Sequence, residues 1–510
     1  MSTPSSFLYP SPSPSALQLH YIGKSLSEIQ PPAAILDLAV IRRNCQHMLE
    51  TTKKLQVGFR AHVKTHKTIE LSRYQVGLNS NSLKFVASTI SEIEGLLPWL
   101  LEENRNRKEE EEEEISILYG LPFTPSSLPR LAQIARLKTT KNPSSVIGLF
   151  VDSPEHIQCL ISFLENNNHT NENSTEKEKE IWPLPIPLYI PIDVGDHREG
   201  ISPHHSSTQL VRIAAILHKY TTKTKHASNN TNTTNKIKLA GFYTHRGGSY
   251  SASNPQEALG FMKEELVGLY EGAKQGGGKE GREEGREKEE RKMVLSLGAT
   301  PTATAIQNLV WEEEEGNETT EAVRKYRDIL KQVQENFEVE FHAGVYPVMD
   351  MQQLATRARP HQSPISGQSL LSFSDLGFRI LVEVASLYFD RGEKPEALIA
   401  AGGIVFGREP CKSYPGWGVV TPWPATSGQV YDPEGDRTGW IVGRISQEHG
   451  NLTWEGSQDQ FRKLELGEKL LVWPNHACIA GVNFGCYLVV DSDQADPDRI
   501  QDVWVRWRGW

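Results

Sequence analysis

Short apolar runs alternate with helical patterns over the first 370 residues or so. The runs are mostly rich in Val, Ile, Leu and Phe, as expected of strands that are buried on both faces. Between them lie stretches of helical period such as "STQLVRIAAILHKY" and "EALGFMKEELVGLY". The strand-like runs cover residues 55–64, 83–89, 115–121, 146–152, 184–194, 237–244, 293–298 and 337–344. These β/α repeats predict a closed parallel (β/α)8 barrel, with an open doubly wound sheet as the alternative.

After about residue 370 the β/α rhythm stops. The segments "ALIAAGGIVFG", "TGWIVGRISQEHG", "KLLVWPNHACIAGV" and "CYLVVD" read as strands with Gly and Pro between them. This pattern predicts a second, all-β domain, either a small barrel or a sandwich. We therefore expect an N-terminal extension over residues 1–30, the barrel over 31–370 and the β domain over 371–510.

Four polar stretches interrupt the patterned sequence, at residues 103–114, 165–180, 221–236 and 271–292. They are runs of Glu, Lys, Asn, Thr and Gly with few apolar residues, so they lack the side chains needed to pack into a core. We interpret them as flexible surface insertions in the barrel domain.

The amino-acid composition limits which partners and which cellular compartment we expect for the protein. A formal charge of −10 argues against a nucleic-acid partner, although part of the acidity lies in polar runs. Five cysteines, an odd number spread over a long chain, fit a reducing compartment better than a disulfide framework. The first residues lack the basic and apolar regions of a signal peptide, and no run of about 18 apolar residues occurs. We expect a cytoplasmic protein without a membrane segment.

Polar residues gather where the predicted barrel strands end, which is where barrel enzymes build their sites. The first such end reads "FRAHVKTHKT" (59–68). If the strand continues, Arg60, His62, Lys64 and His66 share one side, because alternate residues of a strand point the same way. A desolvated lysine at that position forms imines with carbonyl compounds. The plain alternative is an edge strand with one solvated face.

Two later strand ends have the composition of a phosphate cradle. "SLGATPT" places Thr300 and Thr302 after Gly298, and "HAGVYP" contains Gly344, where backbone amides can approach an anion. Taken alone, the first could be an ordinary strand-to-helix turn with a threonine cap. A lysine and a phosphate cradle in one barrel mouth indicate a pyridoxal 5′-phosphate site.

The β domain contributes "PNHAC", in which His476 and Cys478 are two residues apart. We expect them on one side of a strand, and imidazole and thiolate are ligands that suit zinc. Two protein ligands with open coordination fit a catalytic zinc better than a structural one. The alternative is a buried cysteine beside a hydrogen-bonded histidine.

With these motifs the chain resembles the eukaryotic-type D-serine dehydratases. They belong to the fold-type III pyridoxal-phosphate enzymes, which also include D-threonine aldolase and alanine racemase. The resemblance runs from "PPAAILDLAVIRRNCQHM" (31–48) to "HACIAGVNF" (476–484). Its most specific motifs are "HVKTHKT", "YTHRGGSY", "GATPT", "HAGVYPVMD" and "PNHAC". The chain departs at Ala400, where many relatives have Asp, and at Ala61, where they often have Pro.

The resemblance assigns site residues by motif. It implies that Lys64, and not Lys67, carries the cofactor, and that His476 and Cys478 bind zinc. Further contacts implied for the cofactor are Arg198 at the ring hydroxyl, Tyr243 and Tyr250 beside it, and Thr300 or Thr302 with the amides of Gly344 and Val345 at the phosphate. His62 and His66 could tune Lys64 or be ordinary core or solvent-facing histidines.

The activity that the resemblance implies is conversion of D-serine to pyruvate and ammonia. Lys64 would remove the α-proton, and zinc would act as a Lewis acid on the departing hydroxyl group. Fold-type III enzymes also form head-to-tail dimers, so a homodimer is expected.

Other functions would leave different signatures. A D-threonine aldolase-like lyase would cleave the Cα–Cβ bond and resembles relatives with a His-x-Asp metal pair, whereas this chain has Cys478. An amino-acid racemase needs a second acid or base on the opposite face of the substrate and no metal. A non-catalytic pyridoxal-phosphate carrier would keep the barrel without the "PNHAC" domain.

Overall fold

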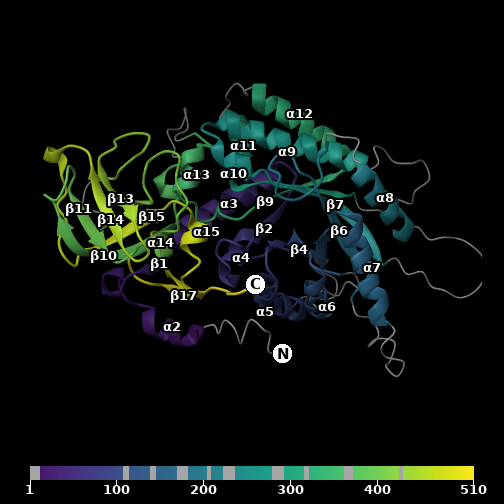
Figure 1. Ribbon diagram of the computed structural model, residues 1–510, viewed down its shortest axis with the longest axis horizontal. Helices are drawn as coiled ribbons and strands as arrows, with labels where there is room; N and C mark the ends of the chain where they lie inside the picture. Colours follow the sequence, from purple (N-terminus) through teal and green to yellow (C-terminus); the bar gives the residue numbers. More distant parts are fainter. Residues whose placement is uncertain are drawn as a thin grey trace, which may run out of the picture.

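The computed structural model describes most of the chain as a barrel domain beside a β domain (Figure 1). The described residues are 12–106, 114–137, 145–168, 182–203, 208–221, 236–277, 292–314, 321–360, 371–423 and 429–510. No helix within these ranges is both long enough and apolar enough to cross a membrane.

Eight parallel strands close into a barrel in sequence order. They are β2 (Gly58–His62), β3 (Ser82–Ala87), β4 (Glu114–Pro122), β5 (Ile147–Phe150), β6 (Ile186–Pro191), β7 (Ile237–Thr244), β8 (Val294–Leu297) and β9 (Glu338–Ala343). The pairing of β2 with β9, with Ala61 opposite Ala343, closes the ring. Each strand falls within a predicted apolar run or within a residue of one, so the (β/α)8 prediction is confirmed.

Helices cover the outside of the barrel, because their apolar stripes need the outward faces of the strands. They are α3 (Leu38–Lys54), α4 (Ile69–Val76), α5 (Ile90–Asn106), α6 (Leu128–Ala135), α7 (Pro154–Asn168), α8 (Thr208–Thr221), α9 (Pro255–Gln275), α10 (Thr300–Ala305), α11 (Gln307–Glu314) and α12 (Glu321–Asn336). A further short helix, α13 (Met351–Thr356), lies on the side of the β domain (Figure 1).

A buried ion pair fills the lower barrel interior. Arg60, 1% exposed, donates from Nε to Glu340 at 2.5 Å, and Lys84 Nζ lies 3.7 Å from the same carboxylate. The Arg60 guanidinium also faces the Tyr189 ring at 5.8 Å. Removing one partner of such a pair would leave a buried charge without its counter-ion, which strongly destabilises a fold. The three residues therefore hold β2, β3 and β9 together inside the barrel.

The β domain confirms the predicted second, all-β unit. Its strands are β1 (Ala33–Asp37), β10 (Phe378–Tyr388), β11 (Glu396–Ile399), β12 (Gly418–Val420), β13 (Gly439–Ile445), β14 (Gly450–Glu455), β15 (Lys469–Pro474), β16 (Cys486–Val490) and β17 (Asp502–Val505). Six of them form a closed ring in the order β11-β14-β13-β12-β15-β10, because β10 pairs with both β15 and β11. The short helices α14 (Gly403–Phe406) and α15 (Ala477–Ala480) follow β11 and β15.

One strand of the β domain comes from before the barrel. The expected boundary groups residues 31–37 with the barrel, whereas β1 lies between β10 and β16 in the second sheet. Ile35 is opposite Arg379 on one side and Leu488 on the other. The predicted strand runs do not include this segment, and a sequence pattern alone does not show which sheet a strand joins.

The polar stretches begin inside helices. Helix α5 continues to Asn106, α7 to Asn168, α8 to Thr221 and α9 to Gln275, so the first residues of all four stretches are helical. Most of the remaining residues of these stretches lie outside the described part of the chain.

Replacing residues 280–290 by a short Gly/Ser linker should leave the melting temperature within a few degrees, because this segment has no apolar residue to bury. A deletion that starts at residue 271 should lower it further. That deletion removes Gly272, where an added Cβ would lie 2.7 Å from Ile192, and the buried Ala273. Thermal unfolding of both variants checks this, and equal losses would contradict it.

Candidate active site

Two cavities open at the carboxyl ends of the barrel strands, and Lys64 and His245 line both of them. One, of about 390 Å³, lies within the barrel mouth and is also lined by His62, Arg198 and Tyr243. The other, of about 400 Å³, lies between the barrel and the β domain. The latter is lined further by Tyr250, Gln352, Glu409, Lys412, His476 and Cys478. Lys64 therefore stands where the barrel site and the β-domain site meet.

Lys64 belongs to a turn and not to the strand. Strand β2 ends at His62, and the Lys67 amide donates to the Val63 carbonyl at 2.9 Å. Lys67 closes this turn with a φ of 53°. The alternation predicted for residues 60–66 is therefore wrong beyond His62, because a turn does not keep the two-residue period of a strand. His66 instead is buried against helix α4, with Nε2 2.9 Å from Gln75 Oε1.

The two lysines of the motif have different surroundings. Lys67 Nζ lies 3.0 Å from the fully buried carboxylate of Glu92 and lines neither cavity. Glu92 also accepts the Ser88 amide at 2.7 Å, so its position is fixed. Lys64 faces the cavities, and among the described residues no carboxylate lies within ion-pair distance of it. Lys64 is thus the amine available to a ligand.

Three imidazoles lie near this amine, those of His62 and His342, which are buried, and that of His245, which lines both cavities. Burial lowers the pKa values of His62, His245 and His342, that of His245 to about 3, and nearby cationic groups such as Lys64 and Arg198 lower them further. They are neutral at ordinary pH. His342 stacks on Tyr243 with ring centroids 4.3 Å apart, and its Nε2 is buried with no hydrogen-bond partner.

Sequence reasoning did not single out His245 or His342, although both lie in the quoted motifs "YTHRGGSY" and "HAGVYP". Strand alternation was the available signal, because His342 follows Glu340 on the inward side of β9. Nδ1 of His342 lies 3.1 Å from the Ser296 hydroxyl on β8, whereas Nδ1 of His245 lies 2.8 Å from the Gly298 carbonyl.

Residues of the two motifs that were predicted to hold a phosphate lie next to each other. The Val345 amide donates to Thr300 Oγ1 at 3.1 Å. At Gly344 an added Cβ would lie 3.2 Å from the His62 carbonyl, so a larger side chain would crowd the lysine turn. Thr302 instead caps helix α10, because its Oγ1 accepts the Ala299 amide at 2.9 Å.

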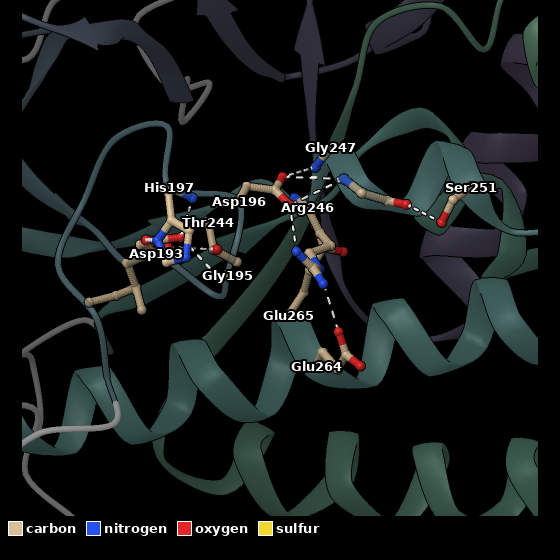
Figure 2. Close-up of polar contacts among 12 residues, drawn as sticks. Asp193, Gly195, Asp196, His197, Thr244, Arg246, Gly247, Ser251, Glu264 and Glu265 are labelled. Atoms are coloured by element: carbon tan, nitrogen blue, oxygen red, sulfur yellow. Dashed lines mark hydrogen bonds and ion pairs between the residues drawn. The ribbon is translucent and has the colours of Figure 1, made fainter.

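Arg198 lies in the loop between β6 and α8. Its Nε donates to the Glu199 carboxylate at 2.5 Å, and both residues line the barrel-mouth cavity. Asp193 shapes the loop by accepting the amides of Gly195 at 2.9 Å and His197 at 3.0 Å (Figure 2). Asp193 therefore has a structural role in this loop.

A second carboxylate ties this loop to the next strand end. Asp196 accepts the Arg246 guanidinium at 2.5 Å and the Gly247 and Gly248 amides at the start of the turn that carries Tyr250 (Figure 2). Beneath it the fully buried Glu265 of α9 accepts the Arg246 amide at 2.8 Å. The loops that present Arg198 and Tyr250 are therefore held as one unit.

His476 and Cys478 line the cavity between the domains, but they do not lie on one side of a strand. Strand β15 ends at Pro474, His476 is the N-cap of α15, and Cys478 lies within that one-turn helix. The expected strand ends early because the chain turns after Pro474 into α15. Cys478 Sγ lies 3.2 Å from Thr65 Oγ1, and His476 Nδ1 contacts the Glu409 carboxylate.

The pKa shifts and the neighbours of His476 and Cys478 are relevant to whether the pair can bind a metal ion. Burial lowers the pKa of His476, and burial raises the pKa of the Cys478 thiol while the Lys64 cation opposes that rise. Imidazole and thiolate suit zinc, and Glu409 has the position of a carboxylate that orients a metal-binding histidine. Over the described ranges, no three or more His, Cys, Asp or Glu side chains are placed to hold a metal ion together. The donor set is thus a pair with open coordination.

The residues fit a pyridoxal-phosphate group as well. The barrel-mouth cavity is lined by the Lys64 amine and by Tyr243, which stacks on His342, while the Thr300 hydroxyl and the Val345 amide are buried and bonded to each other. These are the parts that hold such a cofactor by its aldehyde, ring and phosphate.

Comparison with known proteins agrees with this geometry. Residues 377–490 match the family model described as "Putative serine dehydratase domain". The chain is 29% identical to a D-serine dehydratase of Schizosaccharomyces pombe, over 97% of this chain and 95% of that protein. It is 27% identical to a D-serine dehydratase of Saccharomyces cerevisiae, over 96% and 98%. The D-threo-3-hydroxyaspartate dehydratase structure from Delftia sp. HT23 superposes with a TM-score of 0.65 at 22% identity, over 96% of this chain and 100% of that one.

A closed barrel followed by a β domain is thus the fold that this chain shares with the Delftia dehydratase structure. Over nearly its full length the chain is similar to these D-serine dehydratases, and its residues 377–490 match the serine dehydratase domain model.

Glu265 makes stability depend on pH. Burial raises its pKa from 4.5 to about 8, so between these values the folded protein holds a proton that unfolding releases, and stability falls as pH rises. Glu265→Gln keeps an oxygen for the Arg246 amide without ionising. We expect it to be more stable than wild type near pH 8, by up to about 1.4 kcal/mol for each pH unit above the usual glutamate pKa.

Thermal or urea unfolding at about pH 5.5 and about pH 8 tests this expectation, and the gain should shrink toward the lower pH. Glu264→Gln is the matched control, because Glu264 precedes Glu265 on the same helix but is 56% exposed. A pH-independent difference between Glu265→Gln and wild type would contradict the assignment.

Proposed function

We propose that this protein is a pyridoxal-phosphate- and zinc-dependent D-serine dehydratase that forms pyruvate and ammonia. The observation that carries the proposal is that Lys64, in the barrel mouth, lines one cavity with His476 and Cys478 of the β domain. Supporting it, the Delftia enzyme of the same fold has been solved as a cysteine-to-alanine mutant "in the metal-free form".

The chain's own residues divide the work of holding the cofactor. Lys64 would bond to it covalently, Thr300, Gly344 and Val345 would hold its phosphate, and Tyr243 would lie beside its ring. Arg198, fixed through Glu199 and the Asp193 loop, would stand by the ring hydroxyl. When bound, this cofactor supplies an electron sink for the α-carbon of an amino acid.

Lys64 Nζ is the base that this arrangement offers for the α-proton. It lines both cavities, and the neighbouring imidazoles of His62 and His245 are neutral. His476 and Cys478 would hold zinc at the other side of the cavity. A zinc ion there supplies a Lewis acid for the β-hydroxyl, which is otherwise a poor leaving group.

The β domain favours a dehydratase over a carrier that uses the barrel alone, because it lends two side chains to the cavity. We also propose that the protein acts in the cytoplasm as a homodimer on a small D-amino acid.

Borohydride reduction of the yellow protein should fix the cofactor on Lys64, and peptide mapping should find the adduct there. Lys64→Ala should lose this adduct and all activity. Lys67→Ala is the matched control: it should keep both, at a cost in stability of about 3 kcal/mol, because it leaves Glu92 buried without its cation. An adduct on Lys67 would refute the assignment.

The zinc assignment predicts a difference between leaving groups. Cys478→Ala, or removal of metal by a chelator, should abolish pyruvate formation from D-serine while the bound cofactor keeps its colour. Turnover of β-chloro-D-alanine should fall much less, because chloride departs without a Lewis acid.

A structural zinc would give another result, because its loss would lower the melting temperature and reduce turnover of both substrates together. Cys486→Ala serves as the control, since Cys486 is a free cysteine in the same domain that lines neither of the two cavities.

A further inference from the structure

Arg506 is a buried arginine whose function neither the sequence motifs nor the fold family indicates. It follows directly after β17, near the end of the chain, and is 2% exposed. Over the described residues, no carboxylate lies within ion-pair distance of it. A guanidinium is expensive to bury, so its donors must be satisfied in another way.

The donors of Arg506 reach backbone carbonyls of both domains. Nε donates to the His66 carbonyl at 3.2 Å and Nη2 to the Thr65 carbonyl at 3.3 Å, both in the turn that follows Lys64. Nη1 donates to the Gly481 carbonyl, at the end of the helix that contains Cys478. The planar fork of one side chain thus joins the lysine turn of the barrel to the cysteine turn of the β domain.

The neighbours of Arg506 hold it in place. Its guanidinium faces the Tyr487 ring at 5.7 Å, and its own amide donates to the Gly485 carbonyl at 3.0 Å. The next amide, of Trp507, donates to the Lys67 carbonyl at 2.8 Å. The C-terminal segment therefore packs against the barrel beside α4 and α5 (Figure 1).

Thr65 completes a closed loop of contacts. Its hydroxyl lies 3.2 Å from Cys478 Sγ, while its carbonyl accepts from Arg506. A shift of the cysteine turn therefore moves the residue next to Lys64, and the reverse is also true. Catalytic groups need placement to a fraction of an ångström, which such a closed set of bonds supplies.

We propose that Arg506 is a positioning residue that sets the distance between Lys64 and the metal pair formed by His476 and Cys478. This inference rests on the proposed function. It predicts that loss of the Arg506 side chain lowers turnover most in a reaction that needs both Lys64 and the metal pair. Removal of the α-proton and the β-hydroxyl from one substrate is such a reaction.

The test compares Arg506→Met, Arg506→Lys and the control Arg508→Met. Arg508 lies two residues away on the same segment, is exposed, and donates to the Asn483 carbonyl at 3.4 Å. Zinc affinity is measured by competition with a chelator. Turnover is measured with D-serine and with β-chloro-D-alanine. Hydrogen exchange is followed in peptides covering residues 63–68 and 476–484, and thermal unfolding reports stability.

Arg506→Met should lower the affinity for zinc about ten- to a hundredfold, which is the usual range when a group that supports a metal ligand is removed. It should reduce D-serine turnover more than β-chloro-D-alanine turnover, and speed exchange in both peptides. Arg506→Lys, which keeps the charge but not the fork, should recover part of each loss, and Arg508→Met should match wild type.

Wild-type zinc affinity and an unchanged substrate ratio in Arg506→Met would overturn the proposal, and so would an equal loss on both substrates with unchanged zinc affinity. If Arg506→Met does not fold, the same comparisons are made with Arg506→Lys, and a result identical to Arg508→Met then overturns it. Wild-type protein without activity on D-serine would instead contradict the proposed function, while zinc affinity and exchange would still test Arg506.

Discussion

The pairing of β1 with β10 and β16 is the constraint on which the rest of the structure depends. This strand leaves the β domain and leads directly into α3 and β2, whose end carries Lys64. The chain then completes the barrel and returns to the β domain, where β15 leads into the turn with His476 and Cys478. Because the β domain contains strands from both ends of the chain, the barrel is joined to it on both sides, and backbone hydrogen bonds such as that from the Trp507 amide to the Lys67 carbonyl connect the two directly. A cavity shared by two domains can then have a defined shape.

The two domains contribute different chemical groups to the site. The barrel supplies an amine, neutral imidazoles, and hydroxyl and amide groups for an anion, while the β domain supplies an imidazole and a thiol. Carboxylates such as Asp193, Asp196 and Glu265 bond mostly to backbone amides of the loops. They hold the strand ends in place without lining the cavity between the domains. Lys64 and His245 are the residues that line both cavities, and Lys64 is the one that carries an amine.

The sequence was sufficient to predict the barrel, because its strands are buried on both faces and each forms a separate apolar run. Lys64, Arg198, Tyr243, Tyr250, His476 and Cys478 could also be chosen from motifs, and the structure brings them to the two connected cavities. What periodicity could not show was how local turns redirect side chains. The turn at Lys67 sends His66 to Gln75, and the cap of α10 occupies Thr302. Contacts between distant segments, such as those of Arg506 or β1, leave no local pattern at all.

The most direct test of the proposed function is to identify the product that the purified protein forms from each serine enantiomer. A base at Lys64 and a Lewis acid at His476 and Cys478 predict pyruvate and ammonia in equal amounts from D-serine, with no glycine and no reaction of L-serine. Glycine as the product would show cleavage of the Cα–Cβ bond, and L-serine formed from D-serine would show racemisation. Either result would contradict the proposal that the two halves of the cavity act together to eliminate water.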